Sequence, residues 1–398
     1  MRTDLGWRLD PAVTFLNHGS YGACPEPVLA SQRAWRDRLE SEPVRFMERI
    51  LPDALADARQ RIGAFLGADP AGLAFVSNAT SGVNTVLRSL RFEPGDELLT
   101  NDHEYNATLN ALASIAERDG ARVVVAHVPL PIASAAEALA AIVDAVTPRT
   151  RLALISHITS PTALVLPIAE IVAALDARGV DTIVDAAHAP GMVPLDVDGL
   201  GAAYWTGNGH KWLCGPKGAA MLWVRADRRE RIHPLVISHG ANEPVDGRER
   251  FRLEFDWTGT SDPTPQLALA DAIDWMGDQD PGGWPAIRAA NRALALAGRD
   301  RLASALGLTP IAPDEMTGSM AALLLPGRTD EPTARALQRA LLDEDDIEVP
   351  ITSWPVRAAR SPGDGPTIRL IRISAQRYNE PADFDRLADT LGRRLAAE

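Results

Sequence analysis

The feature that most constrains the fold is an alternation between short β-rich runs and longer helical patterns over residues 60–225. The β-rich runs are LAFVS (73–77), ELLT (97–100), RVVVAHV (122–128), RLALISHI (151–158), DTIVDAA (181–187) and GAAMLWV (218–224). Helical patterns such as TSGVNTVLRSL and IAEIVAALDARG lie between them, and Gly179 is expected to end the second. This spacing predicts an α/β fold with a mostly parallel sheet covered by helices on both faces.

The pattern changes in the last third of the chain. A long Ala/Leu/Arg helix is expected at about 286–305, followed by the strand candidates MAALLLP and TIRLIRIS and a last helix near 381–396. These elements predict a smaller α+β domain. The expected division is an N-terminal segment (1–18) that packs with the small domain, a large domain (19–275) and a small C-terminal domain (276–398).

Two Gly- and Pro-containing stretches, GANEPVDGRERFR and ITSWPVRAARSPGDGP, are predicted to be mobile loops near the ligand site. They overlap residues 236–256 and 345–365, which are expected to shape the pocket. Neither stretch contains a pattern that identifies a substrate side chain.

Composition excludes several classes of protein. The 398 residues carry 40 Lys and Arg against 53 Asp and Glu, and a net charge of −13 argues against binding to nucleic acid and favours small substrates. Cys24 and Cys214 are too few for a disulfide framework, and no Cys/His cluster suggests a metal site. The start of the sequence lacks the apolar run of a signal peptide, and no stretch of about 18 apolar residues occurs. We expect a cytoplasmic protein in a reducing compartment, neither secreted nor bound to a membrane.

Lys211 is the first candidate for chemistry. It lies in WTGNGHKWLCGPKG, a turn-rich segment between two strand-like runs, beside Trp212 and Leu213. Most lysines are solvated surface residues, but apolar flanks and glycines favour partial desolvation. Desolvation lowers the pKa of an amine and makes it a nucleophile or a Schiff-base former.

Asp185 and His188 form a second candidate pair in TIVDAAHAPG. Asp185 ends a β-branched strand, and the carboxyl ends of parallel strands face the crevice where such sheets bind ligands. A helix-capping Asp and a core His would be the alternative. A pyridine ring needs an acidic partner for its nitrogen, which Asp185 would supply. The 26 positions between Asp185 and Lys211 leave room for a loop and one more strand.

A third candidate is VSNATSGVN (76–84), where a strand ends in small polar residues and a helix begins at about Thr80. Free amides and hydroxyls at such a terminus suit a phosphate, although simple capping would use the same residues. Other motifs are incomplete. GNGHKW lacks the last glycine of a dinucleotide fingerprint, and HEYNA lacks the second His of a zinc protease motif.

Together these segments resemble the class V aminotransferase family of fold type I pyridoxal-phosphate enzymes, and within it the isopenicillin N epimerase-like branch. The resemblance covers about residues 15–380 and is carried by FLNHGSYGACP, DHEYNAT, SHITSPTALVLPI, DAAHAPG, GNGHKWLCGPKG, DWTGTSD and RISAQRYN. It implies pyridoxal 5'-phosphate as the cofactor. Lys211 would carry this cofactor as a Schiff base and shuttle the α-proton, Asp185 would pair with the ring nitrogen, and His188 would lie near the ring hydroxyl.

The resemblance also implies the remaining site residues. Tyr105 would stack on the pyridine ring, and Thr260 would reach the phosphate of the neighbouring subunit, so a homodimer with shared sites is expected. Arg372 matches the carboxylate-binding arginine, with Arg369 as the alternative on the same strand. Further cofactor positions are Thr80, Ser81, Ser160, Asn208 and His210, and further substrate positions are Asn17 and Ser20.

Some positions depart from the family pattern. Asn208 stands where many relatives have a phosphate-binding Ser, and Ser160 stands where the desulfurase branch has an Asn. No Cys occurs between residues 215 and 398, which argues against a desulfurase that takes sulfur onto a C-terminal loop cysteine.

The reactions that fit the resemblance share the loss of a group at the α-carbon of an amino acid. Epimerisation or racemisation is expected first, with Tyr105 as the candidate proton donor on the face opposite Lys211. Next is a C–S β-lyase acting on cystine or an S-substituted cysteine, since it needs only Lys211 and a good leaving group. An aminotransferase comes third, and a non-catalytic cofactor-binding regulatory protein is the alternative from another class.

Overall fold

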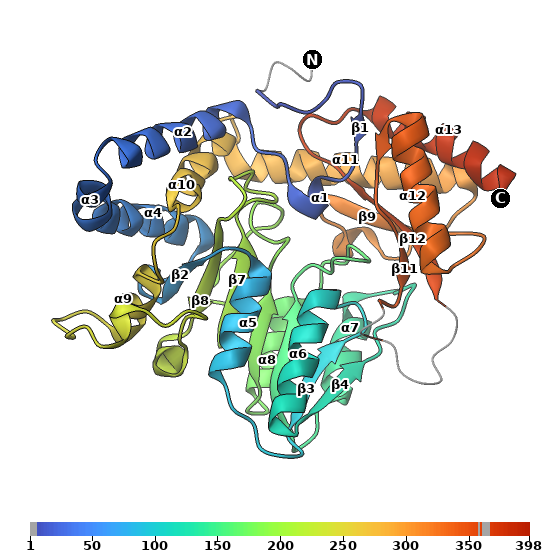
Figure 1. Ribbon diagram of the computed structural model, residues 1–398. Coiled ribbons are helices and arrows are strands. Elements are labelled where there is room, and N and C mark those ends of the chain that lie inside the picture. The colour runs from blue at the N-terminus through green and yellow to red at the C-terminus, as the bar shows by residue number, and fades with distance from the viewer. Residues whose placement is uncertain (1–5, 357–358, 360–366) are drawn as a thin grey trace.

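The computed structural model describes residues 6–356, 359 and 367–398. Its largest element is a seven-stranded sheet with the strand order β2-β8-β7-β6-β5-β3-β4 (Figure 1). The strands are β2 (Leu73–Val76), β3 (Glu97–Asn101), β4 (Arg122–Ala126), β5 (Thr150–Ser156), β6 (Asp181–Asp185), β7 (Tyr204–Asn208) and β8 (Ala220–Val224). Only β8 runs against its neighbours, so the sheet is mostly parallel, as predicted.

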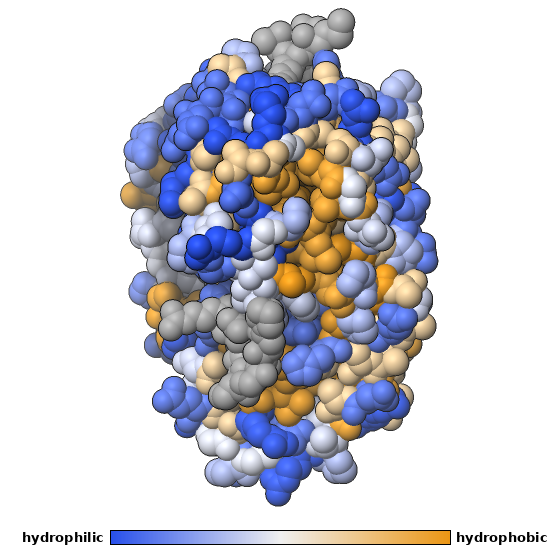
Figure 2. All heavy atoms as spheres, turned by 90° about the vertical axis from the view of Figure 1, so that its right-hand side faces the viewer, coloured by the Kyte–Doolittle hydropathy of each residue, from blue (hydrophilic) through white to orange (hydrophobic). Residues whose placement is uncertain are grey.

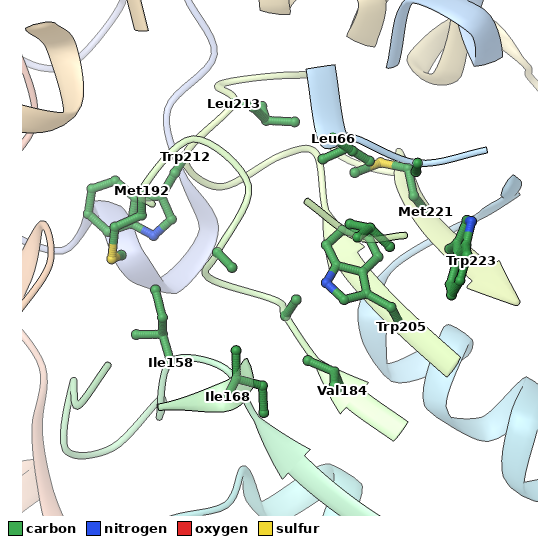
Figure 3. Packing of buried hydrophobic residues seen from close by; sticks show 14 of the residues in the cluster. Leu66, Ile158, Ile168, Val184, Met192, Trp205, Trp212, Leu213, Met221 and Trp223 are labelled. Carbon is green, nitrogen blue, oxygen red and sulfur yellow. The ribbon is translucent and has the colours of Figure 1, made fainter. Parts of the chain in front are cut away.

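Alternation of side chains explains why these strands read as continuous apolar runs. In β5, Leu152 and Leu154 join one buried cluster, whereas Ala153 and Ile155 join another. Successive side chains of a strand point to opposite faces, so both faces of this sheet are covered. Figure 3 shows the second cluster, with Trp205 and Met221 of the central strands packed beside Leu66.

Helices supply the cover on each face. The first cluster is completed by α5 (Ala79–Ser89) and α6 (Asn106–Asp119), which lie side by side in Figure 1. The second cluster is completed by α4 (Leu51–Leu66), α7 (Ala135–Asp144), α8 (Ile168–Asp176) and α10 (Thr264–Gly277). The helix before DTIVDAA ends at Asp176, three residues before the expected Gly179, whose N–H closes a further turn on the Asp176 carbonyl.

A second sheet forms towards the end of the chain. This C-terminal sheet has the antiparallel order β11-β12-β9, and its strands are β9 (Met320–Leu325), β11 (Ile351–Trp354) and β12 (Ile368–Ser374). It shares a buried cluster with α11 (Gly283–Leu306), α12 (Glu331–Asp345) and α13 (Pro381–Ala397). On the side of the molecule that faces right in Figure 1, Figure 2 shows hydrophilic side chains around an apolar area in a hollow.

Short elements connect these layers. Near the N-terminus, β1 (Thr14–Phe15) pairs with β10 (Ile347–Glu348), which draws the start of the chain to the C-terminal sheet. The other short elements are α1 (His18–Tyr21), α3 (Pro43–Arg45), a π-helix (Phe46–Ile50), α9 (Arg250–Asp256) and 3-10 helices at Pro70–Gly72, Ala226–Arg231, His239–Ala241 and Asp314–Met316. The longer helix α2 (Glu26–Ser41) packs against α10. Among the described residues, no helix combines the length and apolar composition that a membrane span requires.

Two sequence expectations for local structure need correction. The segment WTGNGHKWLCGPKG is not wholly a turn, because its first four residues belong to β7. The first four residues of ITSWPVRAARSPGDGP form β11, whereas 357–358 and 360–366 lie outside the described residues. The domain boundary between residues 275 and 276 stays a prediction, and these two residues lie in the last turn of α10.

Candidate active site

Polar side chains gather at the carboxyl ends of the parallel strands. Ser156 ends β5, Asp185 ends β6 and Asn208 ends β7, and Ser156 is the register partner of Asp185. A cavity of about 400 Å³ opens there. Its lining includes nine of the predicted residues: Ser20, Thr80, Tyr105, Ser160, Asp185, His188, Asn208, His210 and Lys211. The structure therefore brings most of the candidate site together at the expected edge of the sheet.

The amine of Lys211 lies 3.1 Å from Nε2 of His188. Burial, with a smaller effect of the Arg372 charge, lowers the pKa of Lys211 to about 7. Burial also lowers the pKa of His188 well below its usual value, so that its ring is neutral. Because the indole N–H of Trp212 donates to Nδ1 of His188 at 3.4 Å, the ring proton belongs on Nε2 and points at Lys211. Such a donor fits a neutral lysine amine with a free electron pair.

Asp185 is almost fully buried, and one carboxylate oxygen accepts the N–H of Ala187 at 2.9 Å. Burial raises the pKa of Asp185, while the hydrogen bond from Ala187 and the Lys211 charge oppose this shift. An acid in this position needs a positively charged or proton-bearing partner. Within the described residues no Lys or Arg forms an ion pair with Asp185, so a ligand bound in the cavity would have to supply the partner.

Glu104 is a second buried acid, which sequence reasoning missed. Its carboxylate accepts the N–H of Ser156 at 2.8 Å, the hydroxyl of Ser156 and the N–H of Tyr105 at 3.2 Å. Burial and the nearby Asp185 raise the pKa of Glu104 to about 8. The segment HEYNA drew attention as an incomplete zinc motif and through Tyr105, yet an acid three residues after the end of a buried strand was the available signal for Glu104.

The N-terminus of α5 lies at one end of the cavity. Asn78 caps the helix by accepting the N–H of Ser81 at 2.8 Å, and Asn208 accepts the N–H of Ala79 at 2.8 Å. Thr80 lines the cavity, but Ser81 does not, since its hydroxyl pairs with that of Ser77. Simple capping therefore accounts for Ser81, while Thr80, Asn208 and His210 remain placed to contact a phosphate.

Arg372 and Arg369 occupy opposite faces of β12, because they are three positions apart and successive side chains of a strand alternate between its faces. Arg369 is engaged by Glu398 and the carbonyl of Pro326, away from the cavity. Arg372 lines an adjoining cavity of about 220 Å³ together with Lys211 and Tyr105. Among the described acids none pairs with Arg372. The geometry therefore favours Arg372 as the anion-binding residue.

Two serines orient the guanidinium of Arg372. The hydroxyl of Ser20 accepts one N–H at 3.0 Å, and the carbonyl of Ser160 accepts another at 2.6 Å. Ser20 in turn donates to Asn17 at 2.5 Å, and Asn17 donates to Glu348 at 2.9 Å. Asn17 lines neither cavity, so it supports Ser20 instead of facing a ligand.

Thr260 lies apart from both cavities in this single chain. It lines a separate hollow of about 380 Å³ together with Val44, Met47 and Trp257. Val44 is 70% exposed there. The predicted role of Thr260 in a partner's site stays a prediction.

The chain is similar to known proteins over nearly its whole length. The model of the family described as aminotransferase class V matches residues 25–387. The chain is 38% identical to isopenicillin N epimerase of Streptomyces clavuligerus, with 96% of this chain and 95% of that protein covered. It is 33% identical to a putative L-cysteine desulfhydrase of Oryza sativa subsp. japonica, with 97% of this chain and 84% of that protein covered.

Solved structures agree on the fold. A cysteine desulfurase of Escherichia coli superposes with a TM-score of 0.80 at 22% identity, covering 98% of this chain and 97% of that one. A cystine C–S lyase superposes with a TM-score of 0.76 at 24% identity, covering 96% and 97%. The predicted α/β fold is confirmed by these likenesses.

Proposed function

Because the chain belongs to the class V aminotransferase family, we propose that it is an epimerase or racemase that acts at the α-carbon of an amino acid. Family membership confirms the expected enzyme class and its cofactor, pyridoxal 5'-phosphate. The choice of epimerisation rests on the likeness to two isopenicillin N epimerases, at 38% and 37% identity.

The residues around the larger cavity fit this cofactor. Asp185, a buried acid that forms no ion pair with a Lys or Arg of the described residues, suits a protonated ring nitrogen, and the start of α5, where Thr80 lines the cavity, suits a phosphate. Between them lies the amine of Lys211, beside His188. We assign the covalent attachment to Lys211, the ring nitrogen to Asp185, and the phosphate to Thr80, Asn208 and His210.

One observation carries the proposed chemistry: an amine with a pKa of about 7 and an arginine that pairs with no acid of the described residues line the same cavity of about 220 Å³. When bound, the cofactor draws electrons from the α-carbon and so weakens its bonds. Arg372 would hold the α-carboxylate in two parallel hydrogen bonds, which fixes the α-carbon near Lys211. The neutral amine of Lys211 would then remove the α-proton.

Epimerisation needs a second proton donor, because Lys211 serves one face of the substrate. Tyr105 is our candidate, since it lines both cavities and is 46% exposed at the mouth of the site. Replacement Tyr105→Phe keeps the ring and removes the hydroxyl, so α-proton exchange should continue while the D-isomer no longer forms. Unchanged epimerisation by Tyr105→Phe would show that another group donates the proton.

A C–S β-lyase is the second candidate. Several relatives at 32–33% identity are named L-cysteine desulfhydrases, and the chain covers 96–97% of its own length in these matches. Such a reaction requires only Lys211 as the base and a sulfur leaving group on the β-carbon. Tyr105→Phe should then have little effect on turnover, which separates the two candidates.

We also propose a homodimer in which Thr260 reaches the phosphate site of the partner. Thr260 does not line the cavity that contains Lys211 of the same chain. Exposed apolar side chains occur at Val44, Leu235, Val236 and Ile237. Burial of such residues is typical of an interface between subunits.

The deciding experiment incubates the purified holoenzyme with L-amino acids, including cystine and other S-substituted cysteines, in deuterated water. NMR follows the products. An amino acid that gains deuterium at the α-carbon and yields its D-isomer without a keto acid supports the epimerase. Formation of pyruvate, ammonia and a sulfur fragment would show that the enzyme is a β-lyase. Formation of a keto acid together with an aminated cofactor would show that it is an aminotransferase.

A further inference from the structure

The main-chain carbonyl of Lys211 is held by two donors from different parts of the chain. Nε2 of His18 lies 3.0 Å from this oxygen, and the N–H of Cys214 donates to it at 3.0 Å. His18 belongs to α1, almost 200 residues away along the sequence, and is fully buried. The backbone that carries the Lys211 amine is therefore fixed by a side chain that contacts neither cavity.

The surroundings of His18 determine which ring nitrogen carries the proton. Burial lowers the pKa of His18 to about 3, so its ring is neutral. A carbonyl oxygen only accepts, so the proton must be on Nε2 to serve Lys211. Nδ1 must then accept, and the hydroxyl of Tyr378 lies 2.8 Å from it. The N–H of Ala23 approaches the same nitrogen at 3.4 Å and favours the same assignment. The amide nitrogen of Gln376 lies 3.4 Å from Nε2, farther away than the Lys211 carbonyl at 3.0 Å, so the carbonyl decides the tautomer.

The loop around Lys211 needs such support because its backbone is strained. Cys214 has φ of 58°, a left-handed conformation that is unfavourable for a residue with a side chain. Gln376, which lies two residues before Tyr378, places its amide nitrogen 3.6 Å from Sγ of Cys214. The segment that follows β12 thus contacts the lysine loop through Gln376 and contacts His18 through Tyr378.

Close packing presses α1 against the same loop. A Cβ atom on Gly22 would lie 2.0 Å from the carbonyl oxygen of His210, so only glycine permits this approach. The rings of His18 and Trp212 are 4.9 Å apart, and Trp212 also donates to His188. His18 therefore packs against Trp212, which in turn holds His188 at the cofactor-facing cavity.

We propose that His18 is a positioning residue that, as the tautomer that donates from Nε2 and accepts from Tyr378, holds the backbone of Lys211 in register with the substrate arginine on β12. This inference rests on the proposed role of Lys211. Tyr378 and Arg372 lie six residues apart on one continuous segment, so the same segment that would bind the carboxylate also braces the base.

The test begins with Tyr378→Phe, which removes one buried hydroxyl and keeps the ring. We expect kcat to fall about tenfold with KM within about twofold, because positioning of the base changes while Arg372 is untouched. In the apoenzyme, the rate of covalent capture of pyridoxal 5'-phosphate, followed by absorbance, should fall by a similar factor. Tyr204→Phe is the matched control, since the buried hydroxyl of Tyr204 has no hydrogen-bond partner among the described residues.

Replacements of His18 separate positioning from packing. His18→Gln keeps a donor that reaches the Lys211 carbonyl and should retain most of the capture rate, whereas His18→Leu should lose it. Adding Tyr378→Phe to His18→Gln should not change the capture rate further, because a glutamine side chain has no ring tautomer that Tyr378 could stabilise. Circular dichroism and thermal unfolding establish that each variant is folded; if His18→Leu is not, Tyr378→Phe and the double variant carry the test.

Borohydride reduction of the wild-type holoenzyme, followed by peptide mapping, distinguishes the two possible failures. A label on a lysine other than Lys211 would refute the proposed site and with it this inference. A label on Lys211, together with wild-type capture rate and kcat in Tyr378→Phe and His18→Leu, would overturn the positioning role alone.

Discussion

Arg372 and Arg369 lie three residues apart on β12 and differ in their partners. We expect Arg372→Gln to raise KM about 100-fold, because the substrate carboxylate loses a planar pair of donors in a buried site. Arg369→Gln should leave KM within about twofold and lower the melting temperature instead, since Arg369 pairs with Glu398. Steady-state kinetics and thermal unfolding of both variants provide the check. A large KM effect in Arg369→Gln would reverse the assignment.

The buried Glu104 predicts a specific dependence of stability on pH. The pKa of Glu104 is about 8 in the folded chain, against the ordinary value of 4.5 that applies to the unfolded chain. Between these two values the folded state holds a proton that the unfolded state has released. Stability is therefore lost as the pH rises from about 4.5 to 8. Glu104→Gln removes this loss, so the melting temperature of the variant apoenzyme should gain on the wild type between pH 5 and pH 8.

Glu97, at the start of the strand that precedes Glu104, provides a control whose pKa is shifted in the opposite direction. A hydrogen bond from Thr147 and the charge of Arg122 lower the pKa of Glu97, which is also buried. Its contribution to stability is present above the unfolded pKa and fades as the pH falls through the lower folded value. Glu97→Gln should thus lose more stability at pH 8 than at low pH. The same pH trend in both variants would contradict the assigned environment of Glu104.

Residues that end strands were predictable because a local pattern places them. Asp185 follows a β-branched run, and that run fixes its position at the edge of the sheet. Glu104 and His18 were not recognised, because their roles depend on Ser156 and Tyr378, which are distant in sequence. The choice between the arginines likewise depends on which face of β12 meets the site.

At the scale of elements, the start of α5 is held against β7 by close contact at Gly82. A Cβ atom there would lie 2.1 Å from Oγ1 of Thr206. We expect Gly82→Ala to displace the helix, to cost about 1–3 kcal/mol of stability and to weaken the affinity for pyridoxal 5'-phosphate. Thermal unfolding and fluorescence titration of the apoenzyme measure the two effects.

Gly392 of α13 is the matched control, because a Cβ atom there meets only one atom of Leu306, at 3.4 Å. Gly392→Ala should be neutral or stabilise the chain by up to about 1 kcal/mol, since alanine favours a helix interior more than glycine does. If Gly82→Ala behaves in the same way, the contact with Thr206 does not position α5.

The strand–helix alternation predicted most elements of the large sheet, because buried parallel strands are apolar on both faces. β7 was expected only as an unplaced further strand, since YWTGN ends in small polar residues that suggest a turn. Burial between β6 and β8, with hydrogen bonds on both sides, overrides that local preference. β11 was taken for part of a loop for a similar reason, because its pairing with β12 is not visible in four residues.

At the scale of the whole molecule, the location of Thr260 gives a prediction about assembly. In a dimer with shared sites, a Lys211→Ala chain still supplies Thr260, and a Thr260→Ala chain still supplies Lys211. Each mixed dimer then contains one intact site and one site that lacks both residues. After dissociation and random reassociation, half of the dimers are mixed, so about a quarter of the wild-type activity per site should return.

Separate measurements on the two parent variants establish the baseline, since each should be impaired alone. Sedimentation of the wild type should show a dimer, and the Lys211→Ala parent should sediment in the same way, because Lys211 lines a cavity and not the hollow beside Thr260. Activity of the mixture equal to the sum of its parents would mean that Thr260 acts within its own chain. Full activity of Thr260→Ala would remove it from the phosphate site altogether, whereas complementation can arise only if the site spans two chains.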